Sequence, residues 1–396
     1  MRSILFLAAF LAPVAAQDWP QFLGPTRNGV YTGQGSEPAV QLWKKPIGAG
    51  FSAPVVAQGK LIVFFREGGK EKVEAWEPDT GKRIWSYSYA TNYRDDFGFD
   101  EGPRSAPLVD AGRIYTCGAE GQLHAVNLAD GKKVWSEDLM SKFRVRKGFF
   151  GAVCAPIVDG NAVMVNAGGA NAGIVAFDKN NGKVLWTATS DEASYSSPLI
   201  ATLGGWKRAL FFTRAGLVDL DPASGKVRHT FAWRSRSMAS VNAATPVVSG
   251  DLLFLSASYA TGAIAFDVKG DQYKKLWSSD DVLSNHYSTS VERNGMLYGF
   301  HGRQEEGQEL RCVDWRTGKV RWSAGGMGAG TVTLAGDTLL ILREGGEMVA
   351  AKADPAQFRA LAKRQLLDAT VRAYPALAAG RLFLRNENSI ACWQLK

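Results

Sequence analysis

Short apolar runs alternate with polar turns along nearly the whole chain, and each run has the length of a β-strand. Many runs open on a small residue followed by proline, and a glycine and a second apolar run usually follow. Short apolar runs bounded by Gly, Pro, Asn and Asp are typical of strands joined by tight turns. The openings read SAPVV at Ser52, SAPLV at Ser105, CAPIV at Cys154, SSPLI at Ser196 and ATPVV at Ala244.

A Gly-Lys turn closes five of these units, as DTGKRIW, ADGKKVW, NNGKVLW, ASGKVRH and RTGKVRW, with KGDQYKKLW as a looser version in a sixth. The glycine supplies the φ > 0 position that closes a hairpin, and an acidic or amide residue four positions earlier accepts N–H bonds in the turn. We expect each terminal Trp to pack against the neighbouring unit, so the repeat is architectural. The turn glycines are Gly81, Gly131, Gly182, Gly225 and Gly318, and the aromatic positions are Trp43, Trp85, Trp135, Trp186, Trp277 and Trp322.

Eight such units follow one another at a spacing of roughly 40 to 50 residues, the length of a four-stranded propeller blade. Their first strands are anchored at Pro54, Pro107, Pro156, Pro198, Pro246, Ser290, Thr331 and Pro375. The sequence therefore predicts an all-β fold over residues 40–396, an eight-bladed β-propeller of four-stranded antiparallel blades. Residues 17–39 form a lead segment.

The last unit stops after its third strand, whereas VQLWKKPIG at residues 40–48 is a strand without a unit. Pairing the two completes the eighth blade and removes exposed sheet edges. We therefore expect the strand that carries Trp43 to lie beside Ala391. In the seventh unit, ADPAQFRALAKRQLL replaces the Gly-Lys turn. There we expect one or two helical turns, with Asp354 as N-cap and Pro355 as the first helical residue.

Residues 1–16 have a basic start, a short apolar run and a small-residue exit, which is the pattern of a secretory signal peptide. No later run is long enough for a membrane-spanning helix. We therefore expect a periplasmic or secreted protein without a lipid-anchor cysteine. Cys117, Cys154, Cys312 and Cys392 form either buried free thiols or one disulfide. The formal net charge of +8 is not gathered in one segment, so nucleic-acid binding is not expected.

The repeated SAP…G…D…TGK..W unit resembles that of the propellers with pyrroloquinoline-quinone-type repeats. This family includes quinone-dependent alcohol dehydrogenases and outer-membrane assembly propellers. The resemblance implies pyrroloquinoline quinone and calcium as cofactors of the enzyme branch, whose quinone stacks on a central tryptophan beside a vicinal disulfide. The chain has no Cys-Cys pair, and no calcium ligand or catalytic residue can be assigned from the motif.

The longer loops join one blade to the next or join second and third strands, so they lie on the face opposite the Gly-Lys turns. Binding residues usually sit on such loops. The residues expected near the central funnel, suited to a polar or anionic ligand, are Arg104, Tyr195, Asn242, His286, Tyr287, Arg303 and Glu305.

Two loop segments carry further chemistry. Asp95, Asp96 and Asp100 are secondary candidates for calcium ligands, although a solvated loop is the preferred interpretation and no metal site is expected. KFRVRKGFF at residues 142–150 interleaves basic and aromatic residues, which favours a partner-binding or membrane-facing edge in an exported protein.

The sequence thus predicts a monomeric binding or scaffolding module of the cell envelope, with an envelope protein or a small polar ligand as its partner. A quinone-dependent oxidoreductase with a reduced cofactor site is the alternative.

Overall fold

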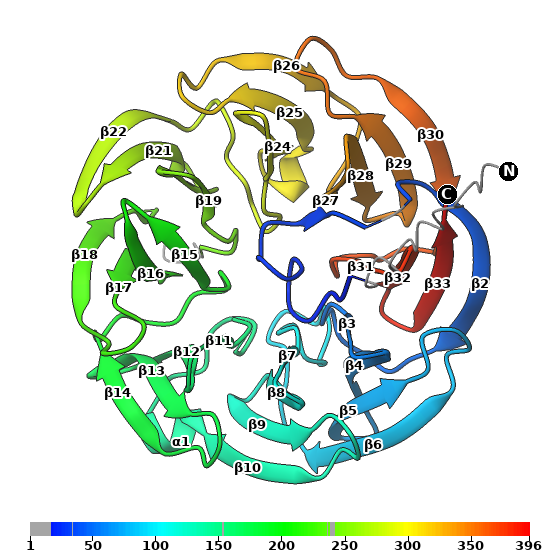
Figure 1. The fold of residues 1–396 in the computed structure, drawn as a ribbon, viewed down its shortest axis with the longest axis vertical. Helices are drawn as coiled ribbons and strands as arrows, with labels where there is room; N and C mark the ends of the chain where they lie inside the picture. The colour runs from blue at the N-terminus through cyan, green and yellow to red at the C-terminus, as the bar shows by residue number, and fades with distance from the viewer. Residues whose placement is uncertain (1–16, 34, 153, 236, 238–241) are drawn as a thin grey trace, which may run out of the picture.

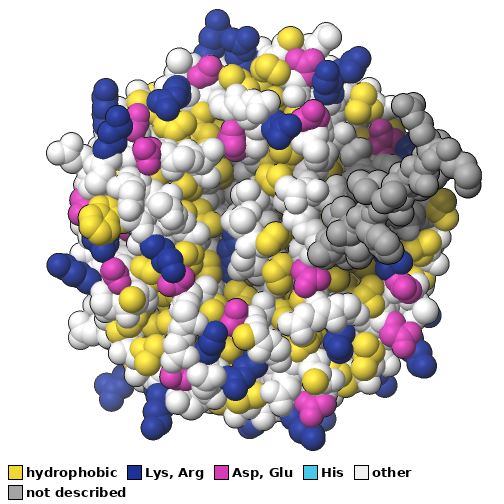
Figure 2. Space-filling model, viewed as in Figure 1, with side chains coloured by type: hydrophobic (Ala, Val, Ile, Leu, Met, Phe, Trp, Pro, Cys, Tyr) yellow, Lys and Arg dark blue, Asp and Glu magenta, His cyan; other side chains and the backbone are white. Residues whose placement is uncertain are grey.

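The computed structural model describes residues 17–33, 35–152, 154–235, 237 and 242–396, so the predicted signal peptide lies outside the described residues. The strands form eight sheets arranged in a ring around an axis, as the repeat predicts (Figure 1). On the face shown in Figure 2, basic and acidic side chains are interspersed around the rim. Within the described residues, no helix has the length and apolar character needed to cross a membrane.

Blades 1 to 4 each contain four consecutive antiparallel strands. Blade 1 holds β3 (Val55–Ala57), β4 (Lys60–Glu67), β5 (Lys70–Trp76) and β6 (Arg83–Ala90); blade 2 holds β7 (Leu108–Asp110), β8 (Arg113–Cys117), β9 (Gln122–Asn127) and β10 (Lys133–Asp138). Blade 3 holds β11 (Ile157–Asp159), β12 (Ala162–Gly169), β13 (Ala172–Asp178) and β14 (Val184–Ala188); blade 4 holds β15 (Leu199–Leu203), β16 (Trp206–Phe212), β17 (Gly216–Leu220) and β18 (Val227–Ala232).

Blades 5 to 8 complete the ring, and only two short helices, α1 (Leu139–Phe143) and η1 (Gln304–Glu306), occur among the described residues. Blade 5 holds β19 (Val247–Ser249), β20 (Leu252–Ala257), β21 (Gly262–Lys269) and β22 (Gln272–Ser279); blade 6 holds β23 (Val291–Arg293), β24 (Met296–His301), β25 (Glu309–Asp314) and β26 (Val320–Ala324). Blade 7 holds β27 (Gly330–Ala335), β28 (Thr338–Arg343), β29 (Glu347–Lys352) and β30 (Ala360–Gln365); blade 8 holds β31 (Ala376–Ala378), β32 (Arg381–Arg385), β33 (Ser389–Leu395) and β2 (Pro38–Pro46).

The ring closes through blade 8, where the early strand β2 pairs with the last strand β33 (Figure 1). The pairing is antiparallel, with Trp43 opposite Cys392 and Lys44 opposite Ala391. The predicted closure is confirmed. Because an early strand and the last strand share one sheet, this pairing joins the first and last blades into a closed ring.

The Gly-Lys turns and the outer tryptophans form a repeated contact between blades, here called the clasp. At Gly182 φ is +74°, and a Cβ atom there would lie 2.9 Å from the Trp135 ring of the preceding blade. Trp135 also donates a 3.0 Å hydrogen bond from Nε1 to the Lys179 carbonyl in the same turn. The turn is therefore repeated for two reasons: glycine allows the left-handed backbone, and it leaves room for the neighbouring tryptophan.

The helix predicted after Asp354 is wrong, because β30 forms there as the ordinary outer strand of blade 7. Asp354 instead accepts a 2.8 Å hydrogen bond from the Ala356 backbone N–H, as in an Asx turn. The clasp is still completed without a glycine. Trp322 donates to the Asp354 carbonyl at 2.8 Å, and the Phe358 ring packs 5.5 Å from the Trp322 ring.

The lead segment crosses the centre of the ring, where Figure 1 shows it in blue. Trp19 forms an antiparallel bridge with Val56 in blade 1, and β1 (Val30–Tyr31) lies parallel to β27 in blade 7. Between them, Arg27 donates hydrogen bonds to the carbonyls of Pro156 and Pro198. The axis is thus filled by the chain itself, with Leu23 packed among Ala53, Ala106, Ala155 and Tyr374.

All four cysteines are buried free thiols in the structure, which selects one of the two alternatives left by the sequence. Burial raises the pKa of all four thiols, to about 11 for Cys154. The four thiols are therefore protonated at neutral pH and contribute packing.

Candidate functional site

The face opposite the Gly-Lys turns carries the inter-blade connections and is here called the loop face; the other is the hairpin face. Five loop-face residues occupy the same place in their repeats, three positions before the Pro or Ser that anchors the first strand. They are Phe51, Arg104, Tyr195, Tyr287 and Arg372. Because the eight blades surround one axis, equivalent positions in the repeats lie around that axis. These five residues therefore belong to one set of equivalent positions on the loop face.

On one side of this set, Arg104 and Tyr195 meet at Phe150. The Arg104 guanidinium carbon lies 4.9 Å from the Phe150 ring centroid, and its Nη1 donates to the Phe150 carbonyl at 3.3 Å. The Phe150 backbone N–H donates to the Tyr195 hydroxyl at 2.8 Å. Burial raises the pKa of Tyr195 to about 12, so this phenol is neutral at physiological pH.

On the other side, Tyr287 belongs to a polar cluster with Glu344 and Arg372. Tyr287 Oη and Arg372 Nε both donate to Glu344 Oε1, each at 2.9 Å. Phe51 joins the two sides, because its ring centroid lies 5.9 Å from the Arg104 guanidinium and 5.5 Å from that of Arg372. Phe51 and Arg372 are not among the residues predicted from the sequence, although their position in the repeat identifies them.

His286, Arg303 and Glu305 lie together around Tyr259, next to the same loops. His286 Nε2 is 3.2 Å from the Tyr259 hydroxyl, and Arg303 stacks 4.6 Å from the Tyr259 ring. Arg303 also pairs with Glu305 at 3.4 Å. Burial lowers the pKa of His286, so the imidazole is neutral at physiological pH.

Asn242 is placed differently, because its side chain is 1% exposed and ties two loops together. Its amide nitrogen donates to the carbonyls of Thr213 and Trp233 at 2.8 and 3.1 Å. It therefore shapes the loop face from within.

The three acidic residues considered for calcium each bind a different partner. Asp95 accepts the Phe99 backbone N–H at 2.6 Å, Asp96 pairs with Lys147 at 2.6 Å, and Asp100 accepts the Gly102 N–H at 2.6 Å. Within residues 17–33, 35–152, 154–235, 237 and 242–396, no group of three or more His, Cys, Asp or Glu side chains could hold a metal ion.

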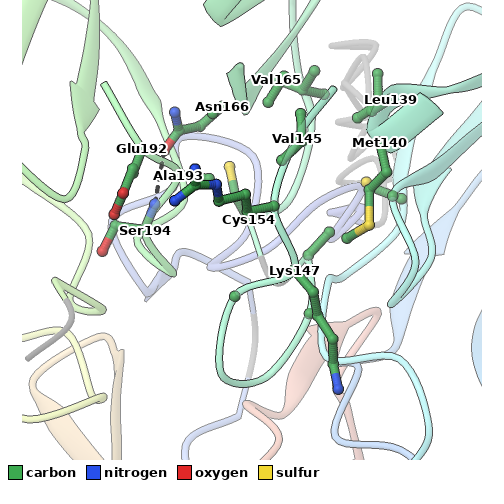
Figure 3. A pocket seen from close by; sticks show the side chains of 18 of the residues that line it. Leu139, Met140, Val145, Lys147, Cys154, Val165, Asn166, Glu192, Ala193 and Ser194 are labelled. Atoms are coloured by element: carbon green, nitrogen blue, oxygen red, sulfur yellow. Dashed lines mark hydrogen bonds between the residues drawn. The ribbon is translucent and has the colours of Figure 1, made fainter. Parts of the chain in front are cut away.

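A cavity of about 510 Å³ opens on the loop face between blades 2, 3 and 4. Figure 3 shows Leu139 and Met140 on one wall and Asn166, Glu192 and Ser194 on the other. Asn166 holds the second wall in place, since its Oδ1 accepts the Ser194 backbone N–H at 3.0 Å.

The residues present do not fit the quinone and calcium that the repeat family's enzyme branch uses. A quinone stacked at the axis would meet Leu23 and Tyr374, which are 1% and 4% exposed and already fill that space. The three aspartates of the loop each interact with separate backbone, lysine or arginine partners, and Asp95 lies 3.7 Å from Arg104.

Comparison with known proteins places the chain among propellers of two kinds. A family model described as outer membrane protein assembly factor BamB matches residues 69–324. BamB of Xanthomonas campestris is 32% identical over 25% of this chain and 26% of its own length. A quinohemoprotein alcohol dehydrogenase of Comamonas testosteroni is 28% identical over 37% of this chain and 21% of its own length. The matched segments thus span about a quarter or less of these relatives.

Solved structures of both kinds share the fold. The structure of BamB from Moraxella catarrhalis superposes with a TM-score of 0.66 at 15% identity, covering 90% of this chain and 98% of that one. The alcohol dehydrogenase of Comamonas testosteroni superposes with a TM-score of 0.69 at 14% identity, covering 95% and 80%. Since the family model spans more than half of the sequence, the chain belongs to the family described as outer membrane protein assembly factor BamB, a propeller with pyrroloquinoline-quinone-type repeats.

Proposed function

We propose that this chain is a binding and scaffolding module of the cell envelope that holds a partner protein on its loop face. The match to the BamB family supports the envelope setting, and the signal-like start of the sequence is consistent with export to the periplasm. A rigid ring with variable loops is suited to presenting a binding surface.

The observation that carries this proposal is the filled axis. Leu23 and Arg27 occupy the centre of the ring, where they pack against the first strands of several blades. Polar and aromatic groups gather instead in the loops above it, around Phe150 and Glu344. A closed centre and a chemically varied outer face favour binding a macromolecule on the loop face over enclosing a substrate at the axis.

Cross-linking in the native envelope tests the proposal. The chain with a C-terminal tag is expressed in its own host, treated with an amine-reactive cross-linker, purified and mapped by mass spectrometry. We expect links from Lys142 and Lys147 on the loop face to one envelope protein. Lys82, Lys132 and Lys183 on the hairpin face are the internal controls. Links only from the hairpin lysines, or none to another protein, would contradict the proposal.

A thermal melt separates this function from the oxidoreductase alternative. A ligand at a hundredfold excess over its Kd stabilises the folded state by about 2.7 kcal/mol. We expect no shift of Tm with pyrroloquinoline quinone plus Ca²⁺, since Leu23 and Tyr374 fill the axis. A Tm raised by several degrees would favour the alternative.

A further inference from the structure

Four phenylalanines form an aromatic patch on the loop face, defined as Phe97, Phe99, Phe149 and Phe150. Phe97 and Phe99 are 53% and 52% exposed. The Phe97 ring lies 6.3 Å from Phe99, 6.0 Å from Phe149 and 5.3 Å from Phe150, so the rings make one continuous surface. Contiguous exposed apolar surface of this kind marks an interaction site.

The patch is held in place by a residue of its own loop and by residues of neighbouring loops. Asp95 accepts the backbone N–H of Phe99, and the Tyr195 hydroxyl accepts that of Phe150. The guanidinium of Arg372 lies 5.4 Å from the Phe99 ring. The backbone N–H groups of Phe99 and Phe150 are therefore held before binding, which reduces the conformational entropy lost when a partner binds.

The cavity of about 510 Å³ shares the loop at residues 147–151 with the patch. Figure 3 shows Val145 and Val165 on its walls, and Leu139 and Met140 continue this apolar lining. An aliphatic wall suits an apolar side chain better than a sugar ring, whose hydroxyl groups need hydrogen-bond partners.

Positive charge is in excess at the rim of the cavity. Lys147 pairs with Asp96, and Arg214 pairs with Glu192 at 3.3 Å. Arg144 and Arg146 also line the cavity and are exposed, and neither makes an ion pair with any residue in the described part of the chain. Two guanidinium groups beside an apolar cavity are complementary to carboxylates.

We propose that the aromatic patch and the adjoining cavity bind an extended, acidic segment of the partner polypeptide. An aromatic or aliphatic side chain of that segment packs on the phenylalanines or enters the cavity, and Asp or Glu residues next to it pair with Arg144 and Arg146. Phenylalanine and arginine are both enriched in protein–protein interfaces relative to the rest of the surface. This inference rests on the proposed function, because it specifies the segment of the envelope partner that the loop face recognises.

Peptide binding to residues 17–396 tests the inference by fluorescence anisotropy. The probes are three labelled eight-residue peptides: one with Asp around Leu and Phe, one with Lys replacing Asp, and one with Asp and Ser only. We expect saturable binding of the first peptide and at least tenfold weaker binding of the other two. Equal binding of all three, equal binding of the Lys peptide, or no saturation would overturn the inference.

Variants locate the site. We expect the double variants Phe97→Ser/Phe99→Ser and Arg144→Glu/Arg146→Glu each to weaken binding of the acidic peptide at least tenfold. Lys82→Glu/Lys183→Glu makes the same charge change on the hairpin face and should leave the Kd unchanged. Tm values within a few degrees of the parent establish folding, and Arg146→Gln alone provides a milder second test.

Two further outcomes would overturn the inference. In the first, an oligogalacturonate displaces the labelled acidic peptide as effectively as the unlabelled peptide does, which indicates a polysaccharide site. In the second, the parent protein self-associates and the double variant Phe97→Ser/Phe99→Ser does not, which indicates that a second copy of the chain binds the patch. If loop-face cross-links in the envelope persist in both double variants, the proposed function stands and this inference fails. If the acidic peptide binds but no envelope protein is cross-linked to the loop face, the peptide site stands and the proposed envelope function fails.

Discussion

The contact between blades 2 and 3 and the contact between blades 4 and 5 hold the ring together by different chemistry. Between blades 2 and 3, the clasp stacks Trp135 on Gly182. Blade 4 ends its Gly-Lys unit in His229, whose ring stacks on Tyr273 of blade 5 with centroids 4.0 Å apart. The repeat therefore tolerates replacement of the tryptophan when the next blade supplies another ring.

A buried ion pair accompanies this replacement. Arg208 Nη1 contacts Asp219, and both side chains have no exposed surface. The Tyr273 hydroxyl donates to Asp219 at 2.6 Å, and Arg208 Nε donates to the Leu203 carbonyl at 2.8 Å. A substitution in an apolar clasp lowers the stability of the fold in proportion to the contact that it removes. Removing one partner of a buried ion pair lowers the stability further, because the remaining buried charge carries a large desolvation cost.

The largest effect is expected from breaking the polar contact. Asp219→Ala removes the buried partner of Arg208 and leaves its guanidinium with only the more exposed Asp271 carboxylate, 3.0 Å from Nη2, so the free energy of unfolding should fall by about 3 kcal/mol. Asp337→Ala, which removes an exposed pair with Arg293, is the control and should cost at most about 1 kcal/mol. Urea unfolding followed by circular dichroism measures both. Equal losses would show that burial of the pair is unimportant.

A loss of at most this size is expected at the clasp. Gly182→Ala places a side chain at φ +74° and pushes against Trp135, which together should cost about 3 kcal/mol. Gly160→Ala is the matched control in the same blade, with φ +55° and open space around the new Cβ. It should cost about 1–2 kcal/mol from backbone strain alone. If the two variants unfold at the same urea concentration, the tryptophan contact contributes nothing beyond the turn.

The smallest effect on stability is expected at the contact between blades 1 and 2, which contains both a tryptophan–glycine clasp and a stacked histidine–tyrosine pair. There Trp85 stacks on Gly131, and His124 stacks 3.9 Å from Tyr89. Burial, with a contribution from Lys133, lowers the pKa of His124 from 6.5 to about 4. His124 of the unfolded chain is protonated below about pH 6.5, whereas in the folded chain it is protonated only below about pH 4. The contribution of His124 to the free energy of unfolding is therefore full above pH 6.5 and decreases as the pH falls below that value.

This linkage predicts a loss of about 2 kcal/mol between neutral pH and about pH 5 from His124. His124→Gln should remove that part of the pH dependence, while other groups continue to titrate. Parallel urea titrations at both pH values give the difference between parent and variant. An unchanged difference would mean that His124 is protonated equally in the folded and unfolded states.

Much of this architecture follows from the sequence alone, because each blade repeats its turn chemistry and its strand pattern. The glycines at φ > 0, the outer tryptophans and the missing fourth strand of blade 8 were sufficient to predict eight blades closed by β2. The helix expected after Asp354 failed because neighbouring strands pair with that segment, and local propensity does not include such pairing. The sequence of the acidic loop likewise does not indicate that the Asp95 carboxylate accepts a backbone N–H of its own loop.

The site depended far more on tertiary structure. Equivalent positions in repeats are visible in the sequence, yet only the ring brings Phe51 between Arg104 and Arg372. The aromatic patch joins two loops separated by about fifty residues, and the filled axis depends on a lead segment with no repeat of its own. The number and order of the blades follow from the sequence, because the contacts between neighbouring blades recur with the repeat. The tertiary structure decided which surface is available for binding, because that surface is assembled from loops that share no pattern.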